Sequence, residues 1–173
     1  MGKTLAIAIL NLQNDFNIGS IIRTANAASV KEILLVGRKR WNKSAATGAH
    51  CLTPLTNIRT SEDLIGYCLD NGYAMVCLEI GKGSKDIFSY PYPEKTMLVV
   101  GNEGAGIPEV IMGASQGIIQ IPQYGQVECL NAAASASIAI YDWVRKEQTG
   151  PENLVAGHKF ERNPHTSNVH LLK

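Results

Sequence analysis

Short apolar runs alternate with helix-like segments over the first 147 residues of this 173-residue chain. The runs are short and rich in Ile, Leu and Val, as buried strands are, and the segments between them space their apolar residues as helices do. The expected strands are residues 5–10, 33–36, 73–79, 97–100 and 117–121. The expected helices are residues 19–28, 61–69 and 130–146. The alternation predicts an α/β domain with a mostly parallel sheet flanked by helices.

Helix and domain boundaries follow from local composition. Ser61, with carboxylates directly after it, indicates the start of the second helix, and Asn71-Gly72 indicates its end. Residues 38–60 are polar with little periodicity, and we interpret their first part as a loop. Beyond residue 149 the apolar pattern fades. We therefore expect one domain over residues 1–149 and a tail over 150–173, partly disordered.

Charge limits the kind of nucleic-acid contact that is available. The formal net charge is only +1, so a nucleic acid must be bound by a local basic patch. Such a patch surrounds Trp41 and consists of Arg38, Lys39, Arg40 and Lys43. A charge run of this kind is a solvated loop as often as it is a nucleic-acid contact. The interleaved Trp41 and the nearby Lys31 and Arg23 favour contact with phosphates.

The cysteines and the N-terminus exclude several protein classes. The four cysteines form no C-x-x-C pair, and no His or Cys spacing predicts a metal site. No disulfide framework is suggested, so a reducing compartment fits best. The apolar run at residues 5–10 is too short for a signal peptide or a membrane span. We expect a soluble, cytoplasmic protein that binds no metal.

Three polar stretches carry the candidate chemistry, and the first is residues 14–25. A turn ending at Gly19 is expected to open a helix, whose first backbone N–H groups attract anions. Arg23, one turn further on, is placed to bind a phosphate or to stabilise a developing oxyanion. The alternative is a capped helix with a solvated arginine.

The second stretch is the glycine-rich loop Gly101-Asn102-Glu103-Gly104-Ala105-Gly106, between a strand and a helix that Pro108 can start. Its spacing fits neither a dinucleotide fingerprint nor a P-loop. The glycines let a ligand approach the backbone closely, and Glu103 can accept hydrogen bonds from donors such as ribose hydroxyls. An ordinary glycine-rich turn is the alternative.

The third stretch runs from Ile121-Pro122, at a strand end, to Leu130-Asn131, at a helix start. Asn131 either caps that helix or holds a reacting group. The helix that follows is rich in Ala and Ser, which permits close approach of a second element or of a ligand. Tight packing explains these small residues at least as well as ligand contact does.

In this order the three stretches resemble the motifs of the SpoU-type, TrmH-like RNA ribose methyltransferases of the SPOUT superfamily, over about residues 4–147. The match comprises Asn17 and Arg23 with Gly19 between them, the string from Val100 to Ile107, and the Ile-Pro and Leu-Asn pairs of the third stretch. The resemblance implies a minimal single-domain SPOUT methyltransferase whose C-terminal segment forms a deep trefoil knot. It also implies a homodimer and methyl transfer from S-adenosylmethionine to a ribose 2′-hydroxyl of structured RNA, with tRNA slightly favoured over rRNA.

The resemblance assigns roles to individual residues. The implied catalytic residues are Asn17, Arg23, Glu103, Cys129 and Asn131. The implied cofactor-binding residues are Val100, Gly101, Asn102, Gly104, Ile121, Pro122, Leu130 and Asn131. RNA contact is expected from the basic loop of Arg38, Lys39, Arg40 and Lys43. Because an arginine stays protonated, we interpret Arg23 as an activator that works with an RNA phosphate rather than as a free base.

Two residues depart from the family pattern. Gln123 stands where Met is usual, and Cys129 stands where Ser is usual. A thiol is a poorer hydrogen-bond partner than a hydroxyl, so a catalytically impaired SPOUT-fold RNA-binding protein is an alternative. The other four implied catalytic residues are retained. An unrelated small α/β enzyme, with the glycine-rich loop around a nucleotide phosphate, is the second alternative.

Overall fold

The structure is a computed structural model that describes residues 2–38 and 40–148, and the backbone of two short strands beyond them. These two strands, β8 (Phe160–Arg162) and β9 (Val169–Leu171), pair antiparallel. The rest of the predicted tail, at 150–159, 163–168 and 172–173, lies outside the described residues. No helix in the described part of the chain is long and apolar enough to cross a membrane.

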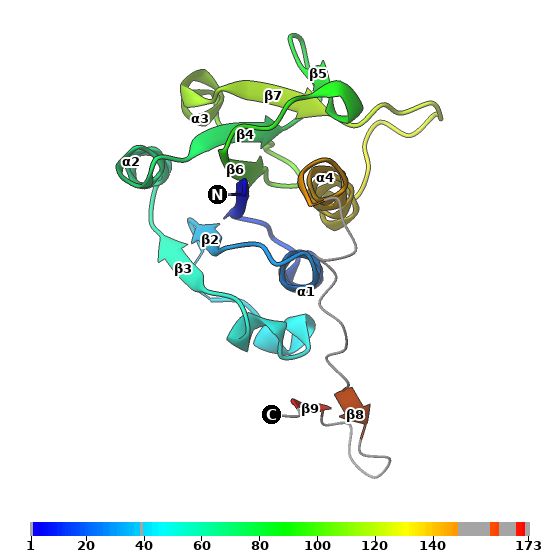
Figure 1. The fold of residues 1–173 in the computed structure, drawn as a ribbon. Coiled ribbons are helices and arrows are strands. Elements are labelled where there is room, and N and C mark those ends of the chain that lie inside the picture. Colours follow the sequence, from blue (N-terminus) through cyan, green and yellow to red (C-terminus); the bar gives the residue numbers. More distant parts are fainter. Residues whose placement is uncertain (1, 39, 149–159, 163–168, 172–173) are drawn as a thin grey trace.

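A parallel sheet of seven strands forms the centre of the molecule (Figure 1). Its order is β3-β2-β1-β6-β4-β7-β5, and every neighbouring pair is parallel. The strands are β1 (Thr4–Leu10), β2 (Ile33–Val36), β3 (Leu55–Ile58), β4 (Ala74–Leu78), β5 (Lys85–Asp86), β6 (Lys95–Val100) and β7 (Gly117–Gln120). The predicted α/β class with a mostly parallel sheet is confirmed.

Helices cover both faces of the sheet. Figure 1 shows α1 (Asp15–Ala27) and α4 (Ala132–Glu147) on one side, with α2 (Ser61–Asn71) and α3 (Glu109–Ala114) on the other. Alternate residues of β1 enter the two cores: Leu5, Ile7 and Ile9 join the core that includes α1 and α4, and Ala6, Ala8 and Leu10 join the other. A parallel sheet buried on both faces needs such uninterrupted apolar strands, which explains why its central strands were predictable.

The first helix begins four residues earlier than predicted. Asn14 is its N-cap, because the Asn14 side chain accepts a hydrogen bond from the backbone N–H of Phe16. Gly19 therefore lies inside α1, and the prediction of a turn ending at Gly19 is wrong. A Cβ at Gly19 would stand 2.3 Å from the backbone of Ala45, so glycine is needed there for close packing and not for a turn.

Residues 38–60 contain more structure than their composition indicates. They form two 3-10 helices, η1 (Lys43–Ala46) and η2 (Ala49–Cys51), and then β3. The middle of β3, Thr56-Asn57, is exposed at the edge of the sheet, so no apolar run marks this strand. The predicted N-cap of α2 is also wrong by one residue. The N-cap is Thr60, not Ser61, and Thr60 forms a capping box with Asp63.

The small side chains of α4 are used mainly for packing. Ala133, Ala136 and Ala139 are buried in the core. The hydroxyls of Thr24 and Ser137 lie 3.0 Å apart, which joins α1 to α4. Ala132 and Ser135 line the cleft described below, so the first turn of α4 also serves that cleft.

Candidate functional site

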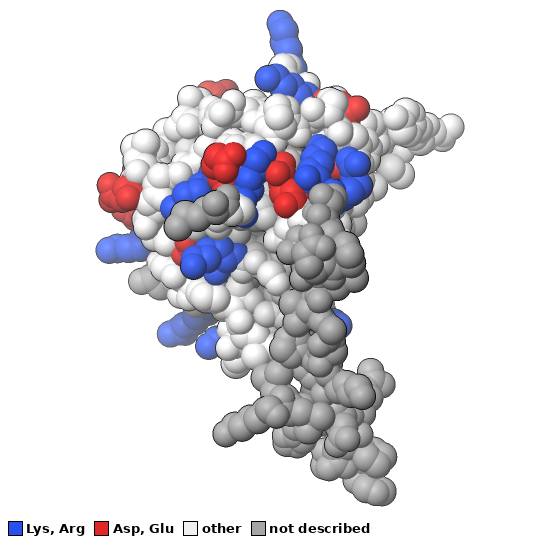
Figure 2. Space-filling model, in the orientation of Figure 1, with Lys and Arg blue, Asp and Glu red and all other residues white. Residues whose placement is uncertain are grey.

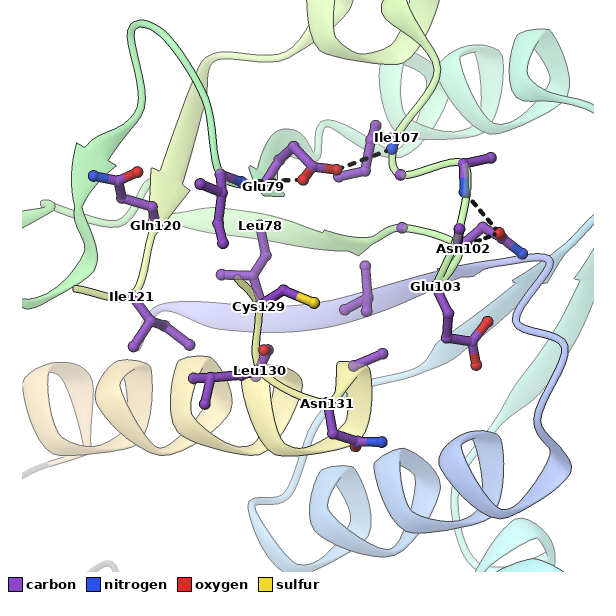
Figure 3. A pocket seen from close by; sticks show the side chains of 18 of the residues that line it. Leu78, Glu79, Asn102, Glu103, Ile107, Gln120, Ile121, Cys129, Leu130 and Asn131 are labelled. Atoms are coloured by element: carbon purple, nitrogen blue, oxygen red, sulfur yellow. Dashed lines mark hydrogen bonds between the residues drawn. The ribbon is translucent and has the colours of Figure 1, made fainter. Parts of the chain in front are cut away.

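A cleft of about 660 Å³ opens at the carboxyl edge of the sheet (Figure 3). The segments that follow β4, β6 and β7 form its walls, together with the start of α4. In open parallel sheets ligands bind outside the carboxyl ends of the strands, where the strand order reverses. Here that point lies between β1 and β6, because β2 and β3 extend to one side and β4, β7 and β5 to the other, and the cleft lies on the β6 side of it.

Most residues expected to bind a cofactor line this cleft. They are Val100, Gly101, Asn102, Gly104, Ile121, Leu130 and Asn131. Pro122 is not among the lining residues. Leu78, Ile121 and Leu130 supply apolar walls, and Figure 3 shows their side chains on the left and centre of the cleft, with Glu103 and Asn131 on the right.

The glycine-rich loop is a tight turn closed on itself. Asn102 and Gly106 exchange both backbone hydrogen bonds, at 3.1 and 2.9 Å. The Asn102 side chain accepts from the N–H groups of Gly104 and Ala105, at 2.9 Å each. Gly106 has φ +65°, and a Cβ at Gly101 would stand 2.7 Å from Gly106. The turn therefore explains these glycines by itself, while it also forms one wall of the cleft.

Glu103 is held as a carboxylate by three donors. Its Oε2 accepts from the Gln13 N–H at 3.0 Å, and its Oε1 accepts from Asn17 Nδ2 at 2.9 Å and the Asn14 N–H at 3.4 Å. Burial raises the pKa of Glu103, but these hydrogen bonds outweigh burial and keep the pKa below its ordinary value of 4.5. Glu103 is therefore anionic at neutral pH and acts as an acceptor.

Asn17 joins two of the other expected catalytic residues. It is buried on α1, donates to Glu103, and accepts from Asn131 Nδ2 at 3.1 Å. Asn131 also caps α4, because its Oδ1 accepts from the N–H groups of Ala133 and Ala134. The interpretation of Asn131 as a helix cap is therefore confirmed, and its role towards a reacting group stays a prediction. Three residues from distant parts of the sequence form one hydrogen-bonded chain, Glu103–Asn17–Asn131, at the end of the cleft.

Cys129 lines the same cleft and is exposed. Figure 3 shows its sulfur pointing into the cleft, towards the end that holds Glu103. The other exposed thiol is Cys51, whereas Cys68 and Cys77 are buried. Among the described residues, no group of three or more His, Cys, Asp and Glu side chains is arranged to hold a metal ion.

The structure does not bring Arg23 into the cleft. Arg23 is exposed on α1 and is not among the lining residues. Six residues separate it from Asn17, which places it about 9 Å further along the helix and about 120° around it. The two implied catalytic residues of α1 therefore face different surroundings within one chain.

The residues of the basic loop differ in exposure and in contacts. Arg40 and Lys43 are exposed, and Lys39 lies outside the described residues. Arg38 turns inward and forms an ion pair with Asp15 at 2.6 Å. Trp41 packs against the core and meets His50 edge to face, so it is not a free stacking surface. Figure 2 shows Lys and Arg side chains side by side with Asp and Glu side chains across the centre of one face of the molecule.

Sequence reasoning missed Glu79, which also lines the cleft. Its carboxylate accepts from the N–H of Ile80 at 3.0 Å and from the N–H of Ile107 at 3.1 Å. It thereby ties the segment after β4 to the glycine-rich loop. The available signal was an acidic residue placed directly after a buried strand.

Comparisons with known proteins point to one family. The sequence profile of the SpoU rRNA Methylase family matches residues 4–141. The tRNA (guanosine(18)-2'-O)-methyltransferase of Escherichia coli K12 is 26% identical over 147 residues, which cover 83% of this chain and 64% of that protein. A putative TrmH family tRNA/rRNA methyltransferase of Staphylococcus saprophyticus is 31% identical over 150 residues, covering 83% of this chain and 60% of the relative.

The fold has a solved counterpart. The AdoMet-bound rRNA methyltransferase from Sinorhizobium meliloti superimposes with a TM-score of 0.78 at 28% identity, over 84% of this chain and 57% of that one. The present chain thus spans about two thirds or less of the length of each of these three proteins.

Proposed function

The chain belongs to the SpoU rRNA Methylase family, and on that premise we propose that it transfers a methyl group from S-adenosylmethionine to a ribose 2′-hydroxyl of structured RNA, tRNA being slightly favoured over rRNA. The observation that carries the proposal is the hydrogen-bonded chain Glu103–Asn17–Asn131 at one end of the cleft. It joins one residue from each of the three sequence motifs. No single helix or turn requires that convergence.

The residues of the cleft suit S-adenosylmethionine. Leu78, Ile121 and Leu130 offer apolar contact to a flat base, and the glycine-rich loop brings the backbone to the cleft surface. Gln123 Oε1 is buried and has no hydrogen-bond partner among the described residues, although it lines the cleft. A buried acceptor of this kind calls for a donor on a ligand. When bound, the cofactor supplies a methyl group on a positively charged sulfur.

The protein's own residues orient and activate the ribose hydroxyl. Transfer would join the 2′-oxygen to the methyl carbon, break the carbon–sulfur bond to leave a neutral thioether, and release the hydroxyl proton to water by way of the Glu103 carboxylate. The anionic Glu103 is placed to accept a hydrogen bond from that hydroxyl, and Asn17 fixes the carboxylate. Arg23 remains protonated and pairs with an RNA phosphate. Alignment of the hydroxyl supplies much of the rate enhancement.

A homodimer accounts for the position of Arg23. The exposed face of α1 is one stripe of Phe16, Ser20, Arg23 and Ala27, and that of α4 is Ala134, Ile138, Tyr141 and Arg145. Phe16 is 72% exposed and Tyr141 is 50% exposed, and the small residues between the large ones allow helices to approach closely. We propose that this face packs on a second copy of the chain, and that Arg23 completes the cleft of that copy.

Three further proposals concern the knot, the domain boundary and the RNA contact. We propose that the C-terminal segment forms the trefoil knot that the family resemblance implies, with the segments after β6 and β7, which both line the cleft, as its parts. We propose a catalytic domain at residues 1–149 and a tail at 150–173. We also propose that Arg40 and Lys43 contact RNA.

A catalytically impaired RNA-binding protein is the second candidate, and Cys129 is the observation that favours it. The thiol stands at the cleft surface, where the family usually has a hydroxyl. On this alternative, the protein binds RNA and cofactor but transfers no methyl group.

Transfer of labelled methyl from S-adenosylmethionine decides between the two. The substrate is total RNA from a host that lacks this gene, separated into tRNA and rRNA, with Arg23→Ala as the comparison. We expect label in one RNA class, lost in the variant. Cofactor binding without any transfer to either class would support the impaired relative, and Cys129→Ser would then be the next variant.

A further inference from the structure

Arg38 is the residue of the basic loop whose contacts the proposed function does not use. Its guanidinium donates to the carbonyl oxygens of Leu12 and Gln13, to Asp15 Oδ1 at 2.6 Å and to the Arg40 carbonyl at 3.0 Å. The planar fork of an arginine suits several fixed acceptors at once. These contacts engage the guanidinium of Arg38, which was predicted to contact RNA, within the chain itself.

The two carbonyls that Arg38 holds belong to the peptide groups that hold Glu103. Leu12 C=O and Gln13 N–H form one peptide group, and Gln13 C=O and Asn14 N–H form the next. Arg38 donates to both carbonyls, and both N–H groups donate to the Glu103 carboxylate. Two adjacent peptide groups therefore lie between the Arg38 guanidinium, on their carbonyl side, and the Glu103 carboxylate, on their N–H side.

This arrangement strengthens both sets of hydrogen bonds. A carbonyl that accepts from a cation polarises its own N–H, which then donates more strongly to the carboxylate. The parts come from the carboxyl ends of three neighbouring strands: Arg38 follows β2, residues 12–14 follow β1, and Glu103 follows β6. Their meeting is thus a consequence of the strand order.

We propose that Arg38 is a positioning residue of the catalytic site, which fixes the Glu103 carboxylate through the peptide groups 12–13 and 13–14. This inference deepens the proposed function and rests on it for its kinetic consequence. Its structural consequence, the state of the Glu103 carboxylate, does not depend on catalysis. Asp15 supports the arrangement, because its second oxygen accepts from the N–H of Asn42 at 2.9 Å and thereby ties η1 to α1.

The test compares Arg38→Ala and Arg38→Lys with two other arginine variants. Arg40→Ala removes an exposed cation of the same loop, and Arg59→Ala removes an exposed arginine that follows the edge strand β3. The first readout is a carbon-13 NMR titration of the Glu103 carboxyl, assigned by its loss in Glu103→Gln. We expect the pKa of Glu103 to rise in Arg38→Ala, to rise less in Arg38→Lys, and to stay unchanged in Arg59→Ala.

The second readout separates positioning from RNA contact. With RNA and cofactor saturating, kcat of Arg38→Ala should fall by about 100-fold, the scale expected for a misplaced reacting group, while the Kd for RNA changes by less than about 2-fold. Arg40→Ala should instead weaken RNA binding and reduce the slope of log Kd against log salt by about 1.

An unchanged Glu103 pKa in both Arg38 variants, with weakened RNA binding and a reduced salt slope, would overturn the proposal and make Arg38 an RNA contact. If Arg38→Ala does not fold, as judged by thermal unfolding, Arg38→Lys decides by the same readouts. If even the unmodified protein transfers no methyl group, the proposed function fails, but the NMR titration still decides the role of Arg38.

Discussion

At the scale of single residues, Gln123 offers a test of the cofactor site that requires no RNA. Its Nε2 donates to the carbonyl of Glu128 at 3.3 Å, which leaves Oε1 as an acceptor in the cleft. Gln123→Met keeps the length of the side chain and removes that acceptor. The Kd for S-adenosylmethionine should rise by about 3- to 10-fold, the value of one hydrogen bond.

Gln126 is the matched control, because it is exposed on the same loop and does not line the cleft. Calorimetric titration of Gln123→Met and Gln126→Met with S-adenosylmethionine gives the comparison. Equal or tighter binding by Gln123→Met would show that the buried oxygen does not meet the cofactor.

Cys129 provides a second residue-scale prediction. Maleimide should modify Cys51 and Cys129, which are exposed, but not Cys68 or Cys77, because burial raises the pKa of Cys68 to about 12 and that of Cys77 to about 11. S-adenosylmethionine should protect Cys129 alone, and mass spectrometry of peptides from the native protein reports each site. Equal protection of Cys51, or none of Cys129, would place the ligand elsewhere.

Glu103 should affect how the free energy of unfolding changes at acid pH. Its pKa in the folded protein is below the ordinary 4.5, so its contribution to the free energy of unfolding is present above that pH and is lost as the pH falls below it. Urea unfolding should therefore show a smaller loss of stability between pH 7 and pH 3.5 for Glu103→Gln than for the unmodified protein. Glu94→Gln, an exposed carboxylate, should behave as the unmodified protein does.

At the scale of elements, one substitution should have opposite effects in two helices. Gly19→Ala puts a methyl group 2.3 Å from the Ala45 backbone, and we expect a loss of at least about 2 kcal/mol as η1 is pushed from α1. Gly66→Ala in α2 meets nothing within 4 Å, and it should stabilise by about 0.5–1 kcal/mol because alanine favours a helix. Thermal unfolding measures both, and a tolerated Gly19→Ala would contradict the packing described here.

The elements also show how far sequence can lead. The strands β1, β2, β4 and β6 were predictable because their side chains are mostly buried and apolar, and β7 was predictable from the apolar pair Ile118-Ile119. β3 and β5 were not, since edge strands keep polar exposed residues, and α1 was placed late because its cap, Asn14, lies well before Gly19. The family resemblance predicted many of the residues that line the cleft. It did not supply the inward turn of Arg38, which depends on carbonyls 25 and 26 residues away.

At the scale of the whole molecule, the proposed homodimer has a direct test. If Arg23 completes the cleft of a second copy, an Arg23→Ala protein mixed with a Glu103→Gln protein should regain activity, because each mixed dimer then holds one intact site. Refolding the two variants together and measuring methyl transfer gives the result. Tyr141→Glu on the exposed stripe should yield monomers in sedimentation. Monomeric, fully active protein would contradict the dimer.

In the proposed function, the cleft lined by Glu103 and Asn131, which Asn17 joins by hydrogen bonds, methylates a ribose oxygen of RNA. The most direct measurement is mass spectrometry of nucleosides from RNA treated with the protein and S-adenosylmethionine, comparing Glu103→Gln with Glu94→Gln. We predict a 2′-O-methylnucleoside with the unmodified protein and with Glu94→Gln, and its loss with Glu103→Gln. A base-methylated nucleoside, or the same 2′-O-methyl yield from Glu103→Gln, would contradict the account.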